Sequence, residues 1–132
     1  MRRLIVVVFS LLALAGCMAP VLTQSGRPLR YPLYFKEWSS KLDDEGMQVV
    51  KSAAVYANSH PLAEVTVNGF AAPDGPKLDN EILARTRAQV VSDTLVANGV
   101  AANRIRRDSE GETPFAFSAF ESRRVEISVL TH

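Results

Sequence analysis

From about residue 29, segments in which apolar residues recur about every 3.6 positions alternate with segments in which they recur every second position. Spacing near 3.6 residues predicts a helix that begins at Asp43 and ends near residues 58–61, and a second helix over about 80–97. Acidic residues at 43–45 suit the positive end of the first helix dipole, and Asn98–Gly99 is a typical helix stop. The inner positions are Met47, Val50, Ala53, Ala54 and Ala57 in the first helix, and Leu83, Arg87, Val90, Val91, Thr94 and Leu95 in the second.

Alternation with a period of two predicts strands before, between and after these helices. The segments are residues 29–35, 64–70, 104–109 and 121–130, the last having the clearest pattern. Pro32 indicates either that the first strand lies at a sheet edge or that regular strand structure begins only after it, at residues 33–35. Pro73, Gly75 and Pro76 predict a loop over 71–79.

The predicted order of elements is therefore β-α-β-α-β-β. This order predicts an α/β fold of the α+β two-layer type, in which a mixed sheet carries both helices on one face. The 116 residues that remain of 132 when residues 1–16 are set aside are enough for one such domain and too few for two.

The first 16 residues have the pattern of a secretory signal peptide. Arg2 and Arg3 precede a short apolar run, and Leu14-Ala15-Gly16 places small residues before Cys17. The run is too short to span a bilayer, which takes roughly 20 apolar residues. An ordinary signal peptide or an uncleaved anchor is the alternative. We expect a signal peptide over 1–16 and a Pro- and Gly-rich linker over 17–28, leaving residues 29–132 as the folded domain.

Leu-Ala-Gly-Cys also resembles the lipobox of bacterial lipoproteins, in which the cysteine after the cut is acylated. Cys17 is the one cysteine of the chain, so it has no internal disulfide partner. The resemblance implies a palmitate-type lipid anchor on Cys17. Met18 in place of Asp implies, by the lipoprotein sorting rule of many Gram-negative bacteria, transfer to the outer membrane with the domain facing the periplasm.

Charge and side-chain chemistry exclude several classes of function. Without Arg2 and Arg3, the 15 basic residues become 13 against 14 acidic ones, so no basic stripe for nucleic acid remains. His60 and His132 have no neighbours at metal-ligand spacing, and no serine lies in a nucleophile motif. Glycines are too few for a phosphate loop. We expect neither catalysis nor a cofactor.

Ordered motifs over about residues 33–130 resemble the OmpA-like C-terminal domain, the peptidoglycan-binding module of outer-membrane proteins and of peptidoglycan-associated lipoproteins. The matching segments are Tyr34-Phe35, Ser39, Leu42, Glu45-Gly46, Gly69-Phe70, Leu83, Arg87-Ala88-Gln89, Val91, Asn98-Gly99-Val100, Ile105, Gly111-Glu112, Pro114 and Ser122–Ile127. The resemblance implies non-covalent binding to the diaminopimelate of the peptidoglycan stem peptide.

In that family an aspartate and an arginine grip diaminopimelate, which presents an ammonium and a carboxylate at one end. Arg87 falls on the family arginine, whose guanidinium can bind a carboxylate bidentately. Ala72 falls on the family aspartate, and Lys36 and Trp38 replace two further family acids. Asp74, two residues after Ala72, is the candidate replacement for the missing carboxylate. Alternatively, Arg87 is a structural arginine with a buried partner.

Three phenylalanines, Phe115, Phe117 and Phe120, crowd the short segment before the last strand. If exposed, they form an apolar patch of the kind that marks a protein partner. Otherwise they cover the sheet edge or fill the core. Arg106–Arg107 and Arg123–Arg124 are interpreted as surface charge, with ligand contact as the lesser alternative.

Two functions follow as hypotheses. The first is an outer-membrane lipoprotein whose periplasmic domain links the membrane to peptidoglycan through Arg87 and Asp74. The alternative is a degenerate module that has lost this binding and docks on proteins of an envelope assembly, such as a secretion, pilus or conjugation apparatus. An Asp74 carboxylate within reach of Arg87 across an open pocket favours the first, and a blocked pocket or a distant Asp74 favours the second.

Overall fold

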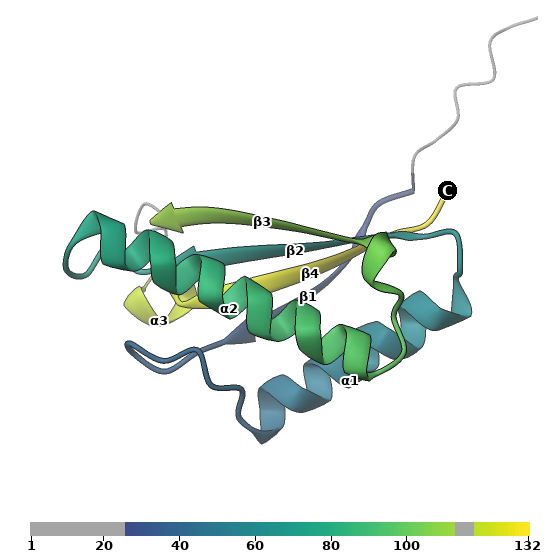
Figure 1. Ribbon diagram of the computed structural model, residues 1–132, viewed down its shortest axis with the longest axis horizontal. Helices are drawn as coiled ribbons and strands as arrows, with labels where there is room; N and C mark the ends of the chain where they lie inside the picture. The colour runs from purple at the N-terminus through teal and green to yellow at the C-terminus, as the bar shows by residue number, and fades with distance from the viewer. Residues whose placement is uncertain (1–25, 113–117) are drawn as a thin grey trace, which may run out of the picture.

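Two long helices cover one face of a four-stranded sheet in the computed structural model, which describes residues 26–112 and 118–132 (Figure 1). The elements in chain order are β1 (Leu29–Tyr34), α1 (Asp44–Ser59), β2 (Glu64–Ala71), α2 (Lys77–Ala97), a 3₁₀ turn (Ala102–Arg104), β3 (Ile105–Glu112), α3 (Ala119–Ser122) and β4 (Arg124–Leu130). The predicted fold class, a two-layer domain with a mixed sheet, is confirmed.

The sheet has the strand order β1-β4-β2-β3, so the last strand of the chain lies between the first two. β4 runs antiparallel to both β1 and β2, while β2 and β3 are parallel and are joined through α2. β1 is at an edge of the sheet, where Pro32 was expected. A parallel pair needs a long crossover connection, and α2 supplies it between β2 and β3.

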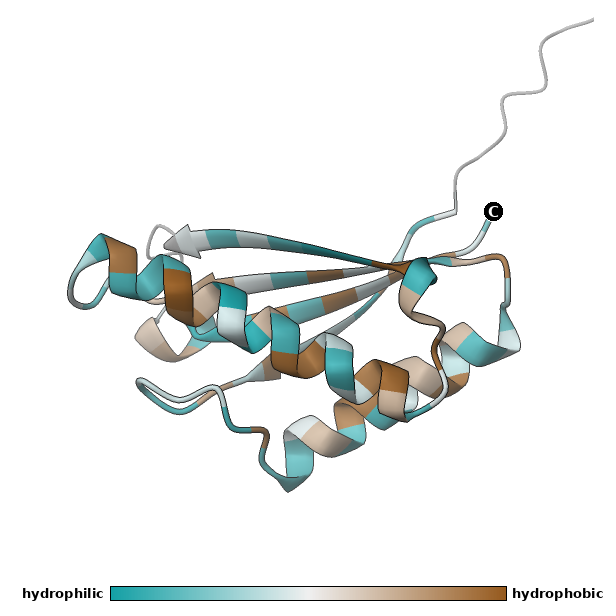
Figure 2. Cartoon of the chain, viewed as in Figure 1, coloured by the Kyte–Doolittle hydropathy of each residue, from teal (hydrophilic) through white to brown (hydrophobic). Residues whose placement is uncertain are grey.

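The core lies between the sheet and the two helices. Apolar and polar residues alternate along β2 and β4, and the apolar ones face the helices (Figure 2). Small side chains on the helices let them approach the sheet closely. The core side chains include Leu33, Phe35, Val50, Ala53, Ala54, Ala57, Val65, Val67, Ala88, Val91, Leu95, Val125, Ile127 and Val129.

Helix α1 begins where its acidic residues predict. The Asp43 side chain caps it by accepting a hydrogen bond of 2.8 Å from the Gly46 backbone N–H. Val50, Ala53, Ala54 and Ala57 are buried as expected, while Met47 is half-buried.

Three predicted boundaries are wrong. Helix α2 starts at Lys77 and not at residue 80, directly after Pro76. A proline fits at this end because the first N–H groups of a helix have no intrahelical partner, so its missing N–H costs no hydrogen bond. β3 extends to Glu112. Residues 121 and 122, predicted as the start of the last strand, belong to α3, because the Ser118 hydroxyl caps this helix by accepting from the Glu121 N–H at 3.1 Å.

Residues 1–25, which include the predicted signal peptide and Cys17, lie outside the described residues, and so do Phe115 and Phe117. Within the described ranges, no helix has both the length and the apolar character needed to cross a membrane.

Helix α2 lies very close to the sheet at Gly69 of β2. A Cβ atom at this position would collide with the backbone carbonyl oxygen of Ala84 and lie 3.1 Å from the Cβ of Ala88. Backbone atoms cannot give way as the end of a flexible side chain can. The contact therefore fixes the distance between α2 and the strand that carries the site described below.

We expect Gly69→Ala to lower the free energy of unfolding by about 3 kcal/mol, because overpacking against backbone forces the helix away from the sheet. Thermal and urea denaturation of the two proteins measure it. Gly46→Ala is the matched control: its Cβ would meet only side-chain atoms, 3.1 Å from Leu42 Cδ2 and 3.2 Å from Asp43 Oδ1. Its stability should stay within about 1 kcal/mol of the unmodified protein. Equal effects of the two substitutions would contradict this role of Gly69.

Candidate functional site

Arg87 of α2 is fully buried, with 0% of its side chain exposed. Its guanidinium donates three hydrogen bonds to backbone carbonyl oxygens: Nε to Ser39 at 2.8 Å, Nη2 to Lys36 at 3.0 Å and Nη1 to Phe70 at 3.3 Å. The guanidinium carbon also lies 5.1 Å from the centre of the Phe35 ring. Arg87 thus ties α2 to β2 and to the loop that follows β1.

Burial, and to a smaller extent the positive charge of Arg123, lowers the pKa of Arg87 to about 10. The side chain therefore remains a cation at neutral pH. Three carbonyl dipoles compensate its desolvation in place of an acid. The structure thus supports the structural alternative for Arg87. Its buried partners are three backbone carbonyls and not a carboxylate. That Arg87 binds the ligand carboxylate stays a prediction.

The loop after β1 presents Trp38 over the next loop. Lys36 and Ser39, the two loop residues whose carbonyls bind Arg87, close a turn in which the Ser39 N–H donates to the Lys36 carbonyl at 3.2 Å. Trp38 lies between them with a φ of 50°. Its indole reaches Gly75: a Cβ there would come within 2.8 Å of Trp38 Cη2.

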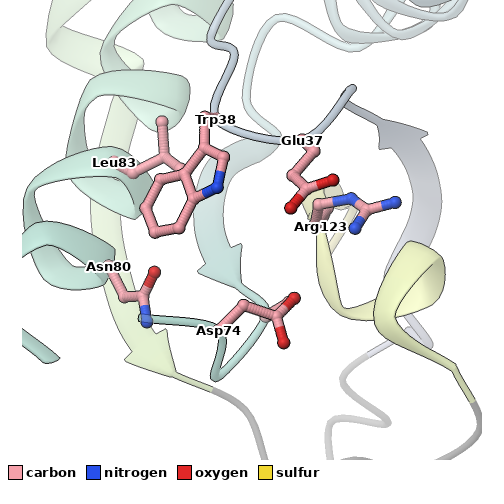
Figure 3. A pocket seen from close by; sticks show the side chains of 7 residues that line it. Glu37, Trp38, Asp74, Asn80, Leu83 and Arg123 are labelled. Atoms are coloured by element: carbon pink, nitrogen blue, oxygen red, sulfur yellow. The ribbon is translucent and has the colours of Figure 1, made fainter. Parts of the chain in front are cut away.

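A small pocket lies at this end of the sheet, with a free volume of about 10 Å³. Its lining comes from the loops after β1 and β2, the first turns of α2, and the turn before β4: Glu37, Trp38, Ala72, Asp74, Asn80, Leu83 and Arg123. Figure 3 shows Trp38, Leu83 and Asn80 on one side, Glu37 and Arg123 on the other, and Asp74 between them.

Charges of both signs line this pocket without being paired to each other. Among the described residues, neither Arg87 nor Arg123 forms an ion pair. The Nε atom of Arg123 is buried and has no hydrogen-bond partner. The carboxylates of Glu37 and Asp74 line the same pocket. Such an arrangement can hold a small zwitterion, with its carboxylate at the guanidinium and its ammonium at an acid.

The structure does not bring together Arg87 and Asp74, the ligand-binding pair predicted from the sequence. Ala72 and Asp74 line the pocket, but Asp74 forms no ion pair with Arg87, which is buried and is not among the lining residues. By the criterion stated from the sequence, a clamp of Arg87 and Asp74 is not formed in this structure. The arginine among the lining residues is Arg123.

Arg123 and Arg124 have different roles although they are adjacent. The Arg124 guanidinium lies 4.1 Å from the centre of the Phe70 ring and pairs with Glu126 at 3.4 Å. Arg123 directly follows α3 and is one of the residues that line the pocket. Sequence reasoning considered ligand contact by this pair only as the lesser alternative, and it did not place Glu37, Asn80 or Leu83 in a site. The one available signal was Trp38, a large aromatic at a position where the family resemblance expects an acid.

Of the three phenylalanines, the structure describes Phe120. Its ring is 54% exposed and stacks on Tyr34 with ring centres 5.0 Å apart. Phe120 is therefore not a core residue, and its ring lies against a residue of the edge strand β1.

Comparison with known proteins places the chain in a family. The model described as "OmpA family" matches residues 34–125. Outer membrane porin F of Pseudomonas fluorescens is 38% identical over 86 residues, which cover 61% of this chain and 26% of the porin. The peptidoglycan-binding protein ArfA of Mycobacterium tuberculosis is 33% identical over 104 residues, 74% of this chain and 32% of ArfA. The chain thus matches about a quarter to a third of the length of these curated relatives.

Solved structures share the fold. The peptidoglycan-associated lipoprotein of Burkholderia pseudomallei superposes with a TM-score of 0.70 at 24% identity, covering 75% of this chain and 89% of that chain. The OmpA-like domain of FopA1 from Francisella tularensis gives a TM-score of 0.71 at 21% identity, with coverage of 79% and 73%.

Arg87→Lys should lower the free energy of unfolding by about 2–4 kcal/mol, because one ammonium cannot reach three carbonyls that a planar guanidinium holds, and the lost bonds are buried. Urea denaturation measures the change. Arg85→Lys, two residues earlier on the exposed side of the same helix, is the matched control and should stay within about 0.5 kcal/mol. If the two variants are equally stable, Arg87 is not the structural tie described here.

Proposed function

Because this chain belongs to the OmpA family, we propose that it is a peptidoglycan-binding domain of the bacterial cell envelope. The observation that carries the proposal is the pocket that Arg123, Glu37 and Asp74 line together, none of them ion-paired within the part of the chain that the structure describes. The name of the relative ArfA states the same ligand class. The names of the porin and of the peptidoglycan-associated lipoprotein indicate a place in the envelope.

The ligand group is the free end of diaminopimelate in the stem peptide. Its carboxylate would bind the Arg123 guanidinium, and its ammonium would bind Asp74, with Glu37 as the second acid. The charge of Arg123 acts on buried Arg87, which indicates that the two guanidinium groups lie near each other. The positive charge of Arg87 would therefore add to the attraction for the ligand carboxylate. Arg87 is then a positioning residue, which holds the loop that carries Glu37.

Attachment to the outer membrane is the second part of the proposal. Lipid on Cys17 would hold the chain to the membrane, and the segment up to residue 28 would act as the linker to β1, which begins at Leu29. A domain bound at one end to lipid and at the other to peptidoglycan links the two layers without covalent attachment to the wall.

A second candidate function is supported by two observations. The pocket has a free volume of only about 10 Å³, and Phe120 with Tyr34 forms an exposed aromatic pair beside β1. These features fit a module that has exchanged peptidoglycan for a protein partner of an envelope assembly. The binding experiment below separates the two candidates.

The mature protein should be retained by sacculi that contain diaminopimelate, and Arg123→Gln should weaken this retention about ten- to a hundredfold. Asp74→Asn should weaken it as well, because the ammonium loses its acid. Co-sedimentation over a range of sacculus concentrations measures the affinity. Peptidoglycan with lysine in place of diaminopimelate lacks the second carboxylate, so Arg123→Gln should have little effect on binding to it.

Arg106→Gln is the matched control, since Arg106 is an exposed arginine of β3 that is paired with Asp108 at 3.0 Å and does not line the pocket. It should bind like the unmodified protein. Absence of retention of the unmodified protein on diaminopimelate sacculi would contradict the proposal and favour the docking module. Retention that Arg123→Gln and Asp74→Asn leave intact would contradict the assignment of the pocket.

Cys17→Ser should abolish incorporation of radiolabelled palmitate and move the protein from the membrane fraction to the soluble periplasmic fraction, since a hydroxyl cannot take the place of the acylated thiol. Fractionation of a Gram-negative host that expresses the full chain measures both. Ser10→Ala, a change within the expected signal peptide, is the control and should leave the protein membrane-bound. Membrane association of the unlabelled Cys17→Ser protein would contradict the lipid anchor.

A further inference from the structure

Trp38 forms one side of the pocket that holds the candidate clamp (Figure 3). The pocket it lines is bounded by the acids Glu37 and Asp74 and by Arg123, and about 10 Å³ remains free. This volume is about the least that holds one water molecule. The end of a diaminopimelate residue carries an ammonium, a carboxylate and the carbon between them, and it needs more room than that.

The indole is held in place by contact alone. Its edge lies against Gly75, where a Cβ would be 2.8 Å from Cη2 and 3.0 Å from Cζ2, so the packing needs a residue without a side chain. The side chain is 52% exposed. Neither a hydrogen bond nor an ion pair joins it to the rest of the described chain. A half-exposed ring with such contacts can leave its place without breaking a polar interaction.

The backbone below Trp38 is fixed while the ring is not. Arg87 holds the carbonyls on both sides, those of Lys36 and Ser39. Trp38 has a φ of 50°, and it is the one residue other than glycine with positive φ in the ranges that the structure describes. A bulky residue rarely adopts this conformation. The loop therefore keeps an unfavourable backbone geometry, and this geometry places the indole in the pocket wall against Gly75.

We propose that Trp38 is a gate that sets the affinity of the pocket by closing it. This proposal rests on the proposed function, since it assumes that the pocket takes the zwitterionic end of diaminopimelate. The ligand binds only to molecules in which the indole has moved away from Gly75. Its apparent dissociation constant is then the intrinsic constant divided by the open fraction. Removing the indole raises the open fraction to one.

The test uses free meso-diaminopimelate as the probe and isothermal titration calorimetry as the measurement. Trp38→Asn removes the ring, and asparagine tolerates the left-handed backbone conformation, so the loop keeps its course. The variant should bind at least about tenfold more tightly than the unmodified protein, which corresponds to a closed form populated about ten to one. Leu78→Asn is the matched control: Leu78 is 65% exposed, lies on α2 and does not line the pocket, and this variant should bind like the unmodified protein.

Fluorescence reports the movement directly, because Trp38 is the only tryptophan in the sequence. Saturating meso-diaminopimelate should increase the quenching of the unmodified protein by acrylamide, as the indole leaves Gly75 for solvent. Thermal unfolding of each variant checks that the fold is kept.

The outcomes separate the gate from the function on which it rests. Tighter binding by Trp38→Asn with increased quenching supports the gate. Equal affinity of the two proteins overturns the gate and leaves the proposed function standing. Weaker binding by the variant also overturns it, since the indole would then be part of the binding surface. Binding by neither protein overturns the gate and counts against the proposed function as well.

Discussion

The buried guanidinium of Arg87 is the interaction on which the site depends. A cation without contact with solvent would be strongly destabilising unless its N–H groups were satisfied, and here three backbone carbonyls satisfy them. Those carbonyls belong to β2 and to the loop after β1, segments that are far apart in the sequence. One side chain of α2 thereby fixes the path of a loop that has no regular structure. The positions of Glu37 and Trp38 follow from that path.

The same arginine couples stability to recognition. Its positive charge is kept at neutral pH although burial lowers its pKa, and the charge of a second arginine, Arg123, acts on it. Neither arginine is ion-paired within the described ranges, and Glu37 and Asp74 bring negative charge to the pocket that Arg123 lines. Under the proposed function, a ligand that carries both charges would offset the charges on both sides of the pocket. Charged groups held close together in this way are typical of functional sites.

The fold could be predicted from the sequence more completely than the site. Alternation in β4 and the 3.6-residue spacing in α1 depend on neighbours in the chain, so both elements were predictable. Helix α2 was harder, because its buried face contains Asn80, Arg87 and Ser92 while Leu78 and Ile82 are exposed. The role of Arg87 could not be predicted, since its partners are backbone carbonyls, which every residue has. Arg123 and Glu37 converge only through the sheet order β1-β4-β2-β3, which places the ends of β1 and β2 beside the start of β4.

The order and direction of the strands also decide how the domain would carry a mechanical load. The loops that follow β1 and β2 and the turn before β4 form one end of the sheet, and the pocket lies there. The linker enters at Leu29, at the opposite end of β1, about 20 Å away along a six-residue strand (Figure 1). Tension between a membrane anchor and a bound cell wall would therefore run parallel to the strands. The hydrogen bonds between β1 and β4 would be loaded in shear and share the force, instead of opening one after another like a zipper.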